Sequence, residues 1–436
     1  MTDRRSFLKQ TGAGLAGAAG RVWAATTRAA GANETIVLGA IGCGGQGTSL
    51  AKKFAALKGV RVAYVCDPDQ ARAEAAAKAV AAIGGEAPRV VKDLRTVLDD
   101  RSVDAVTIAT PDHWHTPAAL LACEAGKHVY VEKPCSHNIR EGRLLVETAR
   151  RTGRVVQHGT QGRSLPLVAF AIGRLREGVI GDVLVAKAWD VQRRKNIGHA
   201  SPSEPPPGFD YDLWLGPAPV VPFQANRHHY TWHWWYDFGT GDMGNDGIHE
   251  LDIARWGLGV ETHPSIISAA GGKYFFDDDQ QFPDTQYVQF EYPGDDKTGR
   301  RLLVFEMRIW SPYGLDDIDN GNAFYGTDGW MLLSKRGVVK VFDAKNRPRP
   351  LDGSPPRLLS HQEDFLEAIR TGRRPSADIA IGHVSATLAH LGNIATRLGR
   401  TLHFDPAQER FLDDEDANRF IRRTYREGHW AVPKGS

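Results

Sequence analysis

The strongest constraint on the fold of this chain is the alternation of short apolar runs with helical stretches over residues 36–157. The apolar runs cover residues 36–41, 60–65, 103–109, 128–131 and 154–157, and the helical stretches between them cover residues 48–57, 69–82, 117–125 and 139–152. Runs of β-branched residues separated by helices are typical of a parallel sheet that helices cover on both faces. The sequence therefore predicts a doubly wound α/β domain here.

A glycine-rich loop directly follows the first apolar run and opens a helix. Gly42 permits a tight turn, Gly44 lets the backbone approach a pyrophosphate, and Gly47 lets the helix pack closely on the strand. The first amides of the helix have no partner within it and are available to an anion. This loop predicts dinucleotide binding by Gly42, Gly44, Gly45, Gln46 and Gly47.

Asp67 ends the second apolar run, 25 residues after Gly42. A carboxylate at this place accepts hydrogen bonds from the adenosine ribose hydroxyls and repels a 2′-phosphate, so the sequence favours NAD over NADP. Arg72 follows closely, and because an arginine here can accommodate a 2′-phosphate, NADP stays the less favoured alternative.

The pattern changes beyond residue 159, where strand-like segments alternate by face. Val288, Phe290 and Tyr292 alternate with polar residues, and residues 303–309 repeat the pattern. Because period-two patterning indicates one buried and one solvated face, this part of the chain predicts an α+β domain with a mostly antiparallel sheet.

Proline and glycine mark further boundaries. Proline-rich residues 202–222 should wrap the surface, and residues 361–370 and 381–398 predict helices that stop at Gly372 and Gly399. We therefore divide the chain into an N-terminal region at 1–32, a dinucleotide-binding domain at 33–158 and a substrate and oligomerisation domain at 159–436.

Composition excludes several classes of protein. The 436 residues include 54 Lys and Arg against 52 Asp and Glu, a net charge of +2, so no general field attracts nucleic acid or an acidic membrane. The four cysteines form no C-x-x-C pair, which argues against a disulfide framework or a zinc ribbon. No run of about 18 apolar residues occurs, so we expect no membrane span.

The first thirty residues resemble a twin-arginine export signal. Arg4 and Arg5 are followed by Phe-Leu-Lys and by a weakly apolar Ala/Gly stretch over residues 11–20, although Asp3 and Arg21 depart from the usual pattern. The alternative is a basic tail without structure. The signal predicts recognition by the twin-arginine export machinery and a periplasmic or otherwise exported protein. Such proteins fold before they cross the membrane, so a cofactor made in the cytoplasm can travel inside them.

Two further motifs follow predicted strands, and two more lie in the second half. Residues 109–115 read Ala-Thr-Pro-Asp-His-Trp-His, residues 131–134 read Val-Glu-Lys-Pro, residues 212–217 read Asp-Leu-Trp-Leu-Gly-Pro, and residues 241–252 read Gly-Asp-Met-Gly-Asn-Asp-Gly-Ile-His-Glu-Leu-Asp. Together with the glycine loop, these ordered motifs make the chain similar to the Gfo/Idh/MocA oxidoreductases. The resemblance extends to the predicted helix at residues 389–398.

The resemblance implies a Rossmann domain followed by a domain with a large open sheet, and a homo-oligomer built through that sheet. It also implies hydride transfer between a nicotinamide and a carbon that bears a hydroxyl, usually on a sugar or polyol. Carried over by position, Lys133 contacts the substrate hydroxyl and the nicotinamide ribose, and His249 acts as general acid/base. The motif residues expected at the cofactor are Thr110, Pro111, His113, His115, Glu132 and Lys133.

The chemistry of this pair suits such a reaction. A carbinol readily loses hydride only if its hydroxyl proton also leaves, so the site needs a base that works near neutrality and a cation that favours the alkoxide. The imidazole of His249 meets the first need and the ammonium of Lys133 the second. The alternative to a catalytic role is that Lys133 is only a surface lysine at a strand end and that His249 is only an interior histidine.

One position departs from the family pattern. Many relatives have an aspartate four residues before the histidine, on the same helical face, where this sequence has Asn245. Asparagine can orient an imidazole but cannot share its proton, so we expect only a positioning role next to the substrate. Asp246 and Glu250 are expected to point elsewhere, because successive helical residues are rotated by about 100°.

Histidines and aromatic residues allow further interpretations. His113 and His115 have metal-ligand spacing, but no cysteine or paired carboxylate completes a site, so we expect no metal; these two histidines line the nicotinamide end or cap the next helix. Residues 228–236 hold three of the eleven tryptophans, which suit either a sugar or the space beneath a long loop. The candidate substrate contacts are Gln161, Arg163, His233 and Asn245.

The leading hypothesis is therefore an NAD-dependent oxidoreductase that acts on a sugar, polyol or glycoside hydroxyl. An exported enzyme finds no soluble NAD pool, so its cofactor should stay bound and be recycled at every turnover. The alternatives are redox-neutral epimerisation or glycoside cleavage, a metal-assisted glycoside hydrolase that uses the histidines, and a non-catalytic sensor of sugar or NAD.

Overall fold

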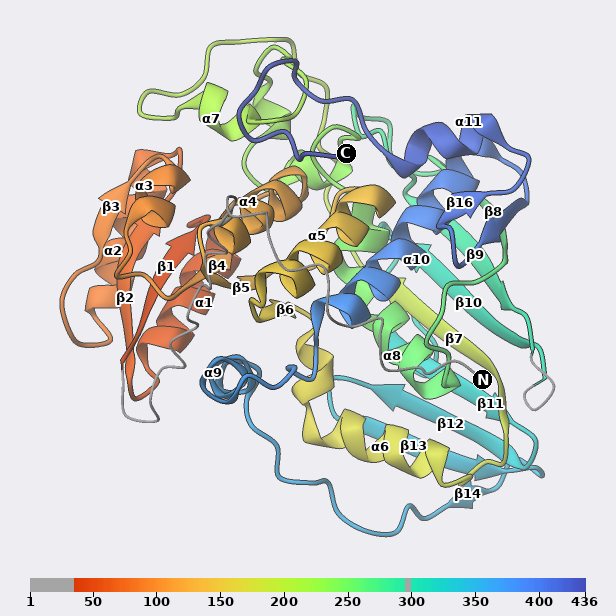
Figure 1. Ribbon diagram of the computed structural model, residues 1–436. Helices are drawn as coiled ribbons and strands as arrows, with labels where there is room; N and C mark the ends of the chain where they lie inside the picture. The colour runs from red at the N-terminus through yellow and green to blue at the C-terminus, as the bar shows by residue number, and fades with distance from the viewer. Residues whose placement is uncertain (1–34, 295–298) are drawn as a thin grey trace, which may run out of the picture.

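The computed structural model describes residues 35–294 and 299–436, which form two domains (Figure 1). The segment that resembles an export signal lies outside these residues. Within the described residues, no helix combines the length and the apolar character needed to cross a bilayer.

The first domain is built on a six-stranded parallel sheet with the order β3-β2-β1-β4-β5-β6. Its strands are β1 (Ile36–Ile41), β2 (Val60–Cys66), β3 (Arg89–Val91), β4 (Ala105–Ile108), β5 (His128–Val131) and β6 (Val156–His158). The order reverses between β1 and β4, and the carboxyl ends of parallel strands at such a point are where ligands bind. This confirms the predicted doubly wound domain.

Helices cover both faces of this sheet. They are α1 (Gly45–Ala55), α2 (Gln70–Ala81), α3 (Leu94–Asp99), α4 (Asp112–Glu124) and α5 (Ile139–Thr152). One more helix, α9 (His361–Thr371), comes from much later in the chain and lies beside the first domain (Figure 1). Its Phe365 packs edge-on against Phe54 and Tyr130. The first domain is therefore completed by a segment from the C-terminal part of the sequence.

The second domain carries a ten-stranded sheet with the order β14-β13-β12-β11-β7-β10-β9-β8-β15-β16. Its strands are β7 (Val183–Val191), β8 (Ile266–Gly272), β9 (Thr285–Tyr292), β10 (Arg301–Arg308), β11 (Asn320–Gly326), β12 (Gly329–Ser334), β13 (Val338–Asp343), β14 (Pro348–Arg349), β15 (Leu402–Asp405) and β16 (Arg410–Phe411). Strands β7 and β10 pair in parallel, while the other described pairs are antiparallel, as predicted.

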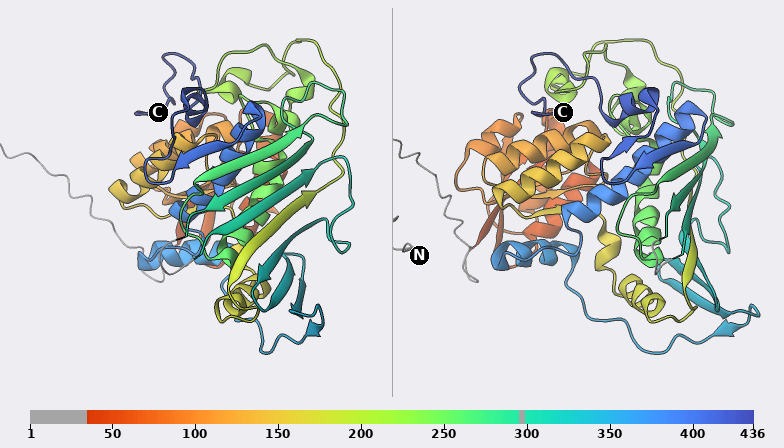
Figure 2. Two further views of the ribbon diagram at one scale, coloured as in Figure 1. Left: turned by 90° about the vertical axis from the view of Figure 1, so that its right-hand side faces the viewer. Right: turned by 45° about the vertical axis from the view of Figure 1, so that its right-hand side comes forward.

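One face of this sheet is covered and the other is open. Helices α6 (Pro166–Arg176), α8 (Ile248–Leu258) and α10 (Ile379–Leu398) pack on the covered face, where Val288, Phe290 and Phe305 are fully buried. Figure 2 shows the open face turned toward the viewer, with no helix in front of its central strands. On that face Tyr287 is 41% exposed, as the alternating pattern predicts.

The proline-rich residues are irregular apart from the short helix α7 (Tyr211–Leu215). A second short helix, α11 (Glu415–Asn418), precedes the C-terminal tail. In Figure 1 this tail and the segment around α7 meet beside the first domain. Both segments bear on the functional site.

Candidate active site

A cavity of about 520 Å³ lies at the carboxyl ends of β1, β2, β4 and β5 and is closed by residues of the second domain. Most of the site residues predicted from the sequence line it. They are Gly42, Gly44, Gly45, Gln46, Asp67, Thr110, Pro111, His115, Glu132, Lys133, Gln161, His233, Asn245 and His249.

The glycine loop forms a cradle that only glycine can build. Gly42 has φ +88°, and a Cβ added to it would lie 2.5 Å from the Ala109 carbonyl oxygen. A Cβ on Gly47 would lie 1.9 Å from the Gly42 carbonyl oxygen, so this residue lies behind the lining and lets α1 pack against the loop. Gly44 caps the N-terminus of α1. The cradle and the free amides of the helix fit the pyrophosphate of a dinucleotide.

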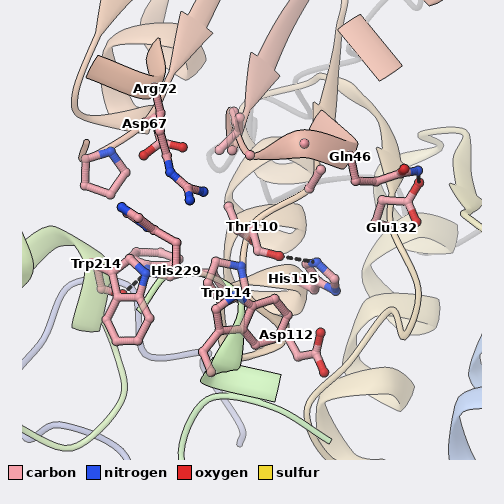
Figure 3. A pocket seen from close by; sticks show the side chains of 18 of the residues that line it. Gln46, Asp67, Arg72, Thr110, Asp112, Trp114, His115, Glu132, Trp214 and His229 are labelled. Carbon is pink, nitrogen blue, oxygen red and sulfur yellow. Dashed lines mark hydrogen bonds between the residues drawn. The ribbon is translucent and has the colours of Figure 1, made fainter. Parts of the chain in front are cut away.

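Asp67 closes the next part of the cavity at the end of β2. Its two carboxylate oxygens accept hydrogen bonds from the backbone amides of Cys43, at 2.7 Å, and Asp69, at 2.9 Å. Burial raises the pKa of this carboxyl, while these amides lower it. The carboxylate thus fixes the glycine loop against the following turn, beside the Arg72 side chain (Figure 3).

His115 and Glu132 join the loops after β4 and β5. The His115 ring lies between the carbonyl oxygens of Pro134 at 2.6 Å and Thr110 at 2.9 Å, and burial lowers its pKa to about 4. Glu132 accepts hydrogen bonds from the side-chain amides of Gln46 at 2.7 Å and Gln161 at 3.1 Å. These contacts hold the predicted cofactor residues in one wall (Figure 3).

His113 does not reach the cavity, contrary to the expectation of a cofactor contact. Helix α4 begins at Asp112, five residues before the predicted start, and turns the His113 ring toward the second domain. There the ring is fully buried beside Phe238, with Nε2 2.9 Å from the Trp214 carbonyl oxygen. His113 therefore joins the two domains.

Arg163 also lies outside the lining, so the structure does not support it as a substrate contact. Its guanidinium forms hydrogen bonds of 2.9 Å to both carboxylate oxygens of Asp252 and stacks on Trp256. Both charged side chains are buried, and a buried arginine is held by such a two-pronged pair. The partner on α8 could not be identified from the local sequence.

Lys133 and His249 come from different domains and both line the cavity. Lys133 Nζ donates to Asn245 twice, to the backbone oxygen at 2.5 Å and to Oδ1 at 3.2 Å. Burial, together with Lys335 and Lys133, holds the pKa of His249 well below its usual range. His249 is therefore a neutral imidazole at neutral pH, as a base requires, and Asn245 positions the lysine.

The residues before His249 form a π-helical turn, Met243–Gly247, and not a regular helix. Because this turn is wider than an α-helical one, both Asn245 and Asp246 line the cavity, although the 100° argument placed Asp246 elsewhere. Glu250 does point away, into a buried ion pair of 2.8 Å with Lys335. The cavity thus holds a carboxylate beside His249 that the sequence pattern did not indicate.

Arg194 fixes Asp246 in place. Its guanidinium contacts Asp246 Oδ2 at 2.5 Å and both oxygens of Asp242 at 3.1 Å, and Gln192 also donates to Asp246. Although burial raises the pKa of Asp246, Lys133 and Arg194 hold it well below its usual range. Asp246 therefore stays ionised.

The aromatic stretch at 228–236 serves two purposes. Tyr230, Trp232 and His233 line the cavity, and the rings of Trp232 and His233 stack with centroids 3.6 Å apart. Trp234 and Trp235 are buried in apolar clusters. Some members of this segment thus form the cavity wall, where a sugar contact stays a prediction, and others belong to the core.

Among the histidines considered for a metal site, His228 and His229 form with Asp69 a group whose ligand atoms lie within 4.8 Å of one another, a spacing that could hold an ion. His113 and His115 contact carbonyl oxygens in different surroundings, whereas His228 and His229 come close to Asp69. His229 Nε2 lies 2.8 Å from Asp69 Oδ2.

Several lining residues escaped sequence reasoning. Asp112 is fully buried and accepts a 2.6 Å hydrogen bond from the Thr240 hydroxyl, and burial raises its pKa to about 7. Trp214, His229 and Trp430 enter the cavity wall from distant segments. Asp112 and Trp214 each lie in one of the sequence motifs, whereas no motif contains His229 or Trp430.

Two protein-family models match the chain. An oxidoreductase family with an NAD-binding Rossmann fold matches residues 36–160, and the C-terminal alpha/beta domain of the same family matches residues 188–291 and 345–432. The chain belongs to the Gfo/Idh/MocA oxidoreductase family.

Solved structures of low sequence identity share this fold. A levoglucosan dehydrogenase in complex with NADH and levoglucosan matches with a TM-score of 0.63 and 20% identity, covering 85% of this chain and 99% of that one. An aldose-aldose oxidoreductase from Caulobacter crescentus, complexed with glycerol, matches with a TM-score of 0.63 and 19% identity over 85% and 100% of the two chains.

A curated relative is more similar in sequence but over a shorter region. The glycosyl hydrolase family 109 protein 2 of Shewanella sp. (strain ANA-3) is 32% identical over 209 residues, which are 43% of this chain and 45% of the relative. The match therefore spans less than half of either protein.

Proposed function

We propose that this protein is a nicotinamide-dependent oxidoreductase acting on a hydroxyl of a sugar, polyol or glycoside. The observation that carries the proposal is that Lys133 and the neutral His249 share one cavity with the glycine cradle of the first domain. Family membership supports the reaction type, and the structures of similar fold that hold levoglucosan or glycerol support a polyhydroxylated substrate.

The chain offers a complete setting for the cofactor. Gly42, Gly44 and the N-terminus of α1 would hold the pyrophosphate. Asp67 would accept hydrogen bonds from the ribose hydroxyls, and this role supports NAD over NADP. When bound, the nicotinamide supplies the acceptor or donor of hydride.

The protein's own groups then manage the proton. The Lys133 ammonium favours the alkoxide form of the reacting hydroxyl, and the neutral His249 takes the hydroxyl proton. The ionised Asp246 stabilises the imidazolium that results. Asn245 keeps the lysine in place through its two oxygen atoms.

Turnover with a panel of sugars and polyols tests this proposal. We expect the absorbance of reduced nicotinamide to rise when the NAD⁺-loaded protein is mixed with at least one member of the panel, and Lys133→Ala and His249→Ala to slow this rise strongly. If both variants keep wild-type turnover, a non-catalytic sensor would be the better description.

A redox-neutral reaction with a retained cofactor is the second candidate. It is favoured by the relative named as a glycosyl hydrolase and by the predicted export, which would separate the enzyme from soluble NAD. In this reaction a hydroxyl carbon would give its hydride to the bound nicotinamide, and the neighbouring C–H, now acidic, would lose its proton as the glycosidic bond breaks and the departing oxygen takes up a proton. Water would then add across the resulting double bond, with its hydroxyl on the former glycosidic carbon and a proton on the neighbouring carbon, and the hydride would return to the carbonyl carbon. Cleavage of nitrophenyl glycosides in D₂O would place deuterium on that neighbouring carbon, whereas a metal-assisted hydrolase would place none there and would lose activity to a chelator.

We also propose export by the twin-arginine route and self-association through the open sheet face. The exposed Tyr287 and Leu184 on the outer side of β9 and β7 support the second idea. Cell fractionation tests the first, and light scattering of wild type against Tyr287→Arg tests the second.

A further inference from the structure

One end of the cavity is covered by chain segments that do not belong to the first domain. We call residues 208–214, His229 and Trp430 the roof. Leu213, Trp214, His229 and Trp430 line the same cavity as Asp67, Pro68 and Arg72, which form the end expected for the adenosine. Figure 3 shows His229 and Trp214 facing the side of the cavity that carries Asp67 and Arg72.

The roof is bonded to the turn that directly follows Asp67. The Gln70 amide donates to the Gly208 carbonyl oxygen at 3.2 Å, and the Asp210 amide donates to the Pro68 carbonyl oxygen at 2.9 Å. Between them Asp69 and Phe209 form an antiparallel bridge. His229 adds the 2.8 Å contact to the Asp69 carboxylate. A segment of the second domain is thus joined to the cofactor side of the first.

The C-terminal tail fastens the other side. Trp430 packs on Trp114 with ring centroids 5.8 Å apart, and the Arg95 guanidinium lies 4.4 Å from the Trp430 ring. Arg426 forms a 2.7 Å ion pair with Asp212 of the roof, and its amide donates to the Pro217 carbonyl oxygen at 2.9 Å.

The roof is itself a packed unit. An apolar cluster of its own includes Phe209, Trp214 and Phe238, all of them buried. The Trp114 indole donates to the Leu213 and Trp214 carbonyl oxygens at 3.2 and 3.0 Å, and a Cβ on Gly216 would lie 2.1 Å from the Trp114 ring. To open the adenosine end of the cavity, the apolar contacts of this cluster and the hydrogen bonds of Trp114 must therefore break at the same time.

We infer that the roof is part of the cofactor site and makes the dinucleotide a retained group, with Trp214, His229 and Trp430 contacting its adenosine half. The inference rests on the proposed nicotinamide chemistry. Its physical basis is that these segments cover the adenosine end, so release through this end requires the contacts to Asp69, Pro68, Gln70 and Arg95 to break while the ligand is still bound. Exchange should then be slow, whatever the sugar.

Isotope exchange tests this without any substrate. The protein is purified, its nicotinamide content is measured by mass spectrometry, and after loading with NAD⁺ it is diluted into deuterium-labelled NAD⁺. We expect slow exchange in wild type and an exchange rate about tenfold higher or more in His229→Ala/Trp430→Ala, because a bond to a carboxylate and an aromatic contact are lost.

A matched double variant controls for general loosening. His199→Ala/Trp330→Ala also removes a histidine bound to an aspartate, Asp279 at 2.6 Å, and a stacked tryptophan, but neither residue lines the cavity. It should exchange at the wild-type rate. Equal exchange rates in wild type and the roof variant, or the same acceleration in the control, would overturn the inference while leaving NAD⁺ binding intact. A wild-type protein that never takes up NAD⁺ would overturn the proposed function as well.

Discussion

The two halves of the cavity are built in different ways. The half from the first domain is shaped by backbone: Gly42, Gly47 and the start of α1 make a surface that no side chain could share. The half from the second domain is shaped by charge, with Arg194 and Asp246 around a neutral His249 and with Lys133 added from the first domain. On the proposed chemistry, the first half selects the ligand by its shape, and the second half controls the proton transfer.

The sharpest test of this division is His249→Ala. Removing a general acid/base costs about 10²- to 10⁴-fold in turnover, and we expect a loss in this range, while NAD⁺ affinity stays within about twofold. Turnover by absorbance and NAD⁺ affinity by calorimetry measure the two effects separately. His403→Ala, a change at an exposed histidine, is the control. If NAD⁺ affinity fell in parallel with turnover, the two halves would not be separable.

The converse change is Gly47→Ala. Its Cβ would lie 1.9 Å from the Gly42 carbonyl oxygen, so the loop must move, and we expect NAD⁺ affinity to fall about 10- to 100-fold. Gly173→Ala in α6 is the matched control, because a Cβ at Gly173 has no atom within 4 Å among the described residues and Gly173 does not line the cavity. Calorimetry with NAD⁺ on both variants measures the difference. Similar affinities in the two variants would contradict the role given to the cradle.

The same division explains what could be predicted from the sequence. The glycine loop, Asp67 and Lys133 follow strand ends directly, so the apolar runs located them. Short elements escaped: β3 has three residues and α3 has six, too few to show a period. The early start of α4 also escaped, and this is why His113 was assigned to the wrong surroundings.

Residues fixed by distant partners could not be predicted at all. Arg163 is bound by Asp252, 89 positions away, and His229 by Asp69, 160 positions away. The π-helical turn at 243–247 shifts Asp246 into the cavity, and the regular 100° rotation assumed from the sequence does not hold there. These features depend on tertiary packing that no local pattern records.

In the half of the cavity from the second domain, Asp246→Asn should lower turnover by about tenfold, which is less than the loss expected for His249→Ala. The amide oxygen can still accept from Arg194, but the charge that stabilises protonated His249 is gone. Because Asp246 raises the pKa of His249, its removal lowers that pKa and moves the acidic limb of the kcat/KM profile to lower pH. A pH–rate profile measures this shift, which a purely structural defect would not cause.

A second substitution distinguishes Asp246 from its neighbour. Asn245→Asp places a carboxylate at the position where the family resemblance implies an aspartate, but Asn245 Nδ2 lies 2.8 Å from Asp242 Oδ1, so like charges would meet. We expect the double variant Asp246→Asn/Asn245→Asp to stay as slow as the single one. Recovery of wild-type turnover would show that the carboxylate belongs at position 245.

The smallest expected effect concerns stability and belongs to the first half. His115 is buried between two carbonyl oxygens with its pKa lowered to about 4, whereas an unfolded histidine titrates near 6.5. Between these values the unfolded chain binds a proton that the folded chain does not, so the free energy of unfolding falls as pH decreases from about 6.5 to about 4, by up to about 3 kcal/mol from this residue. The free energy of unfolding, measured with urea at several pH values, should depend less steeply on pH in His115→Gln than in wild type. An unchanged slope would mean that other buried histidines, such as His361, carry the pH dependence.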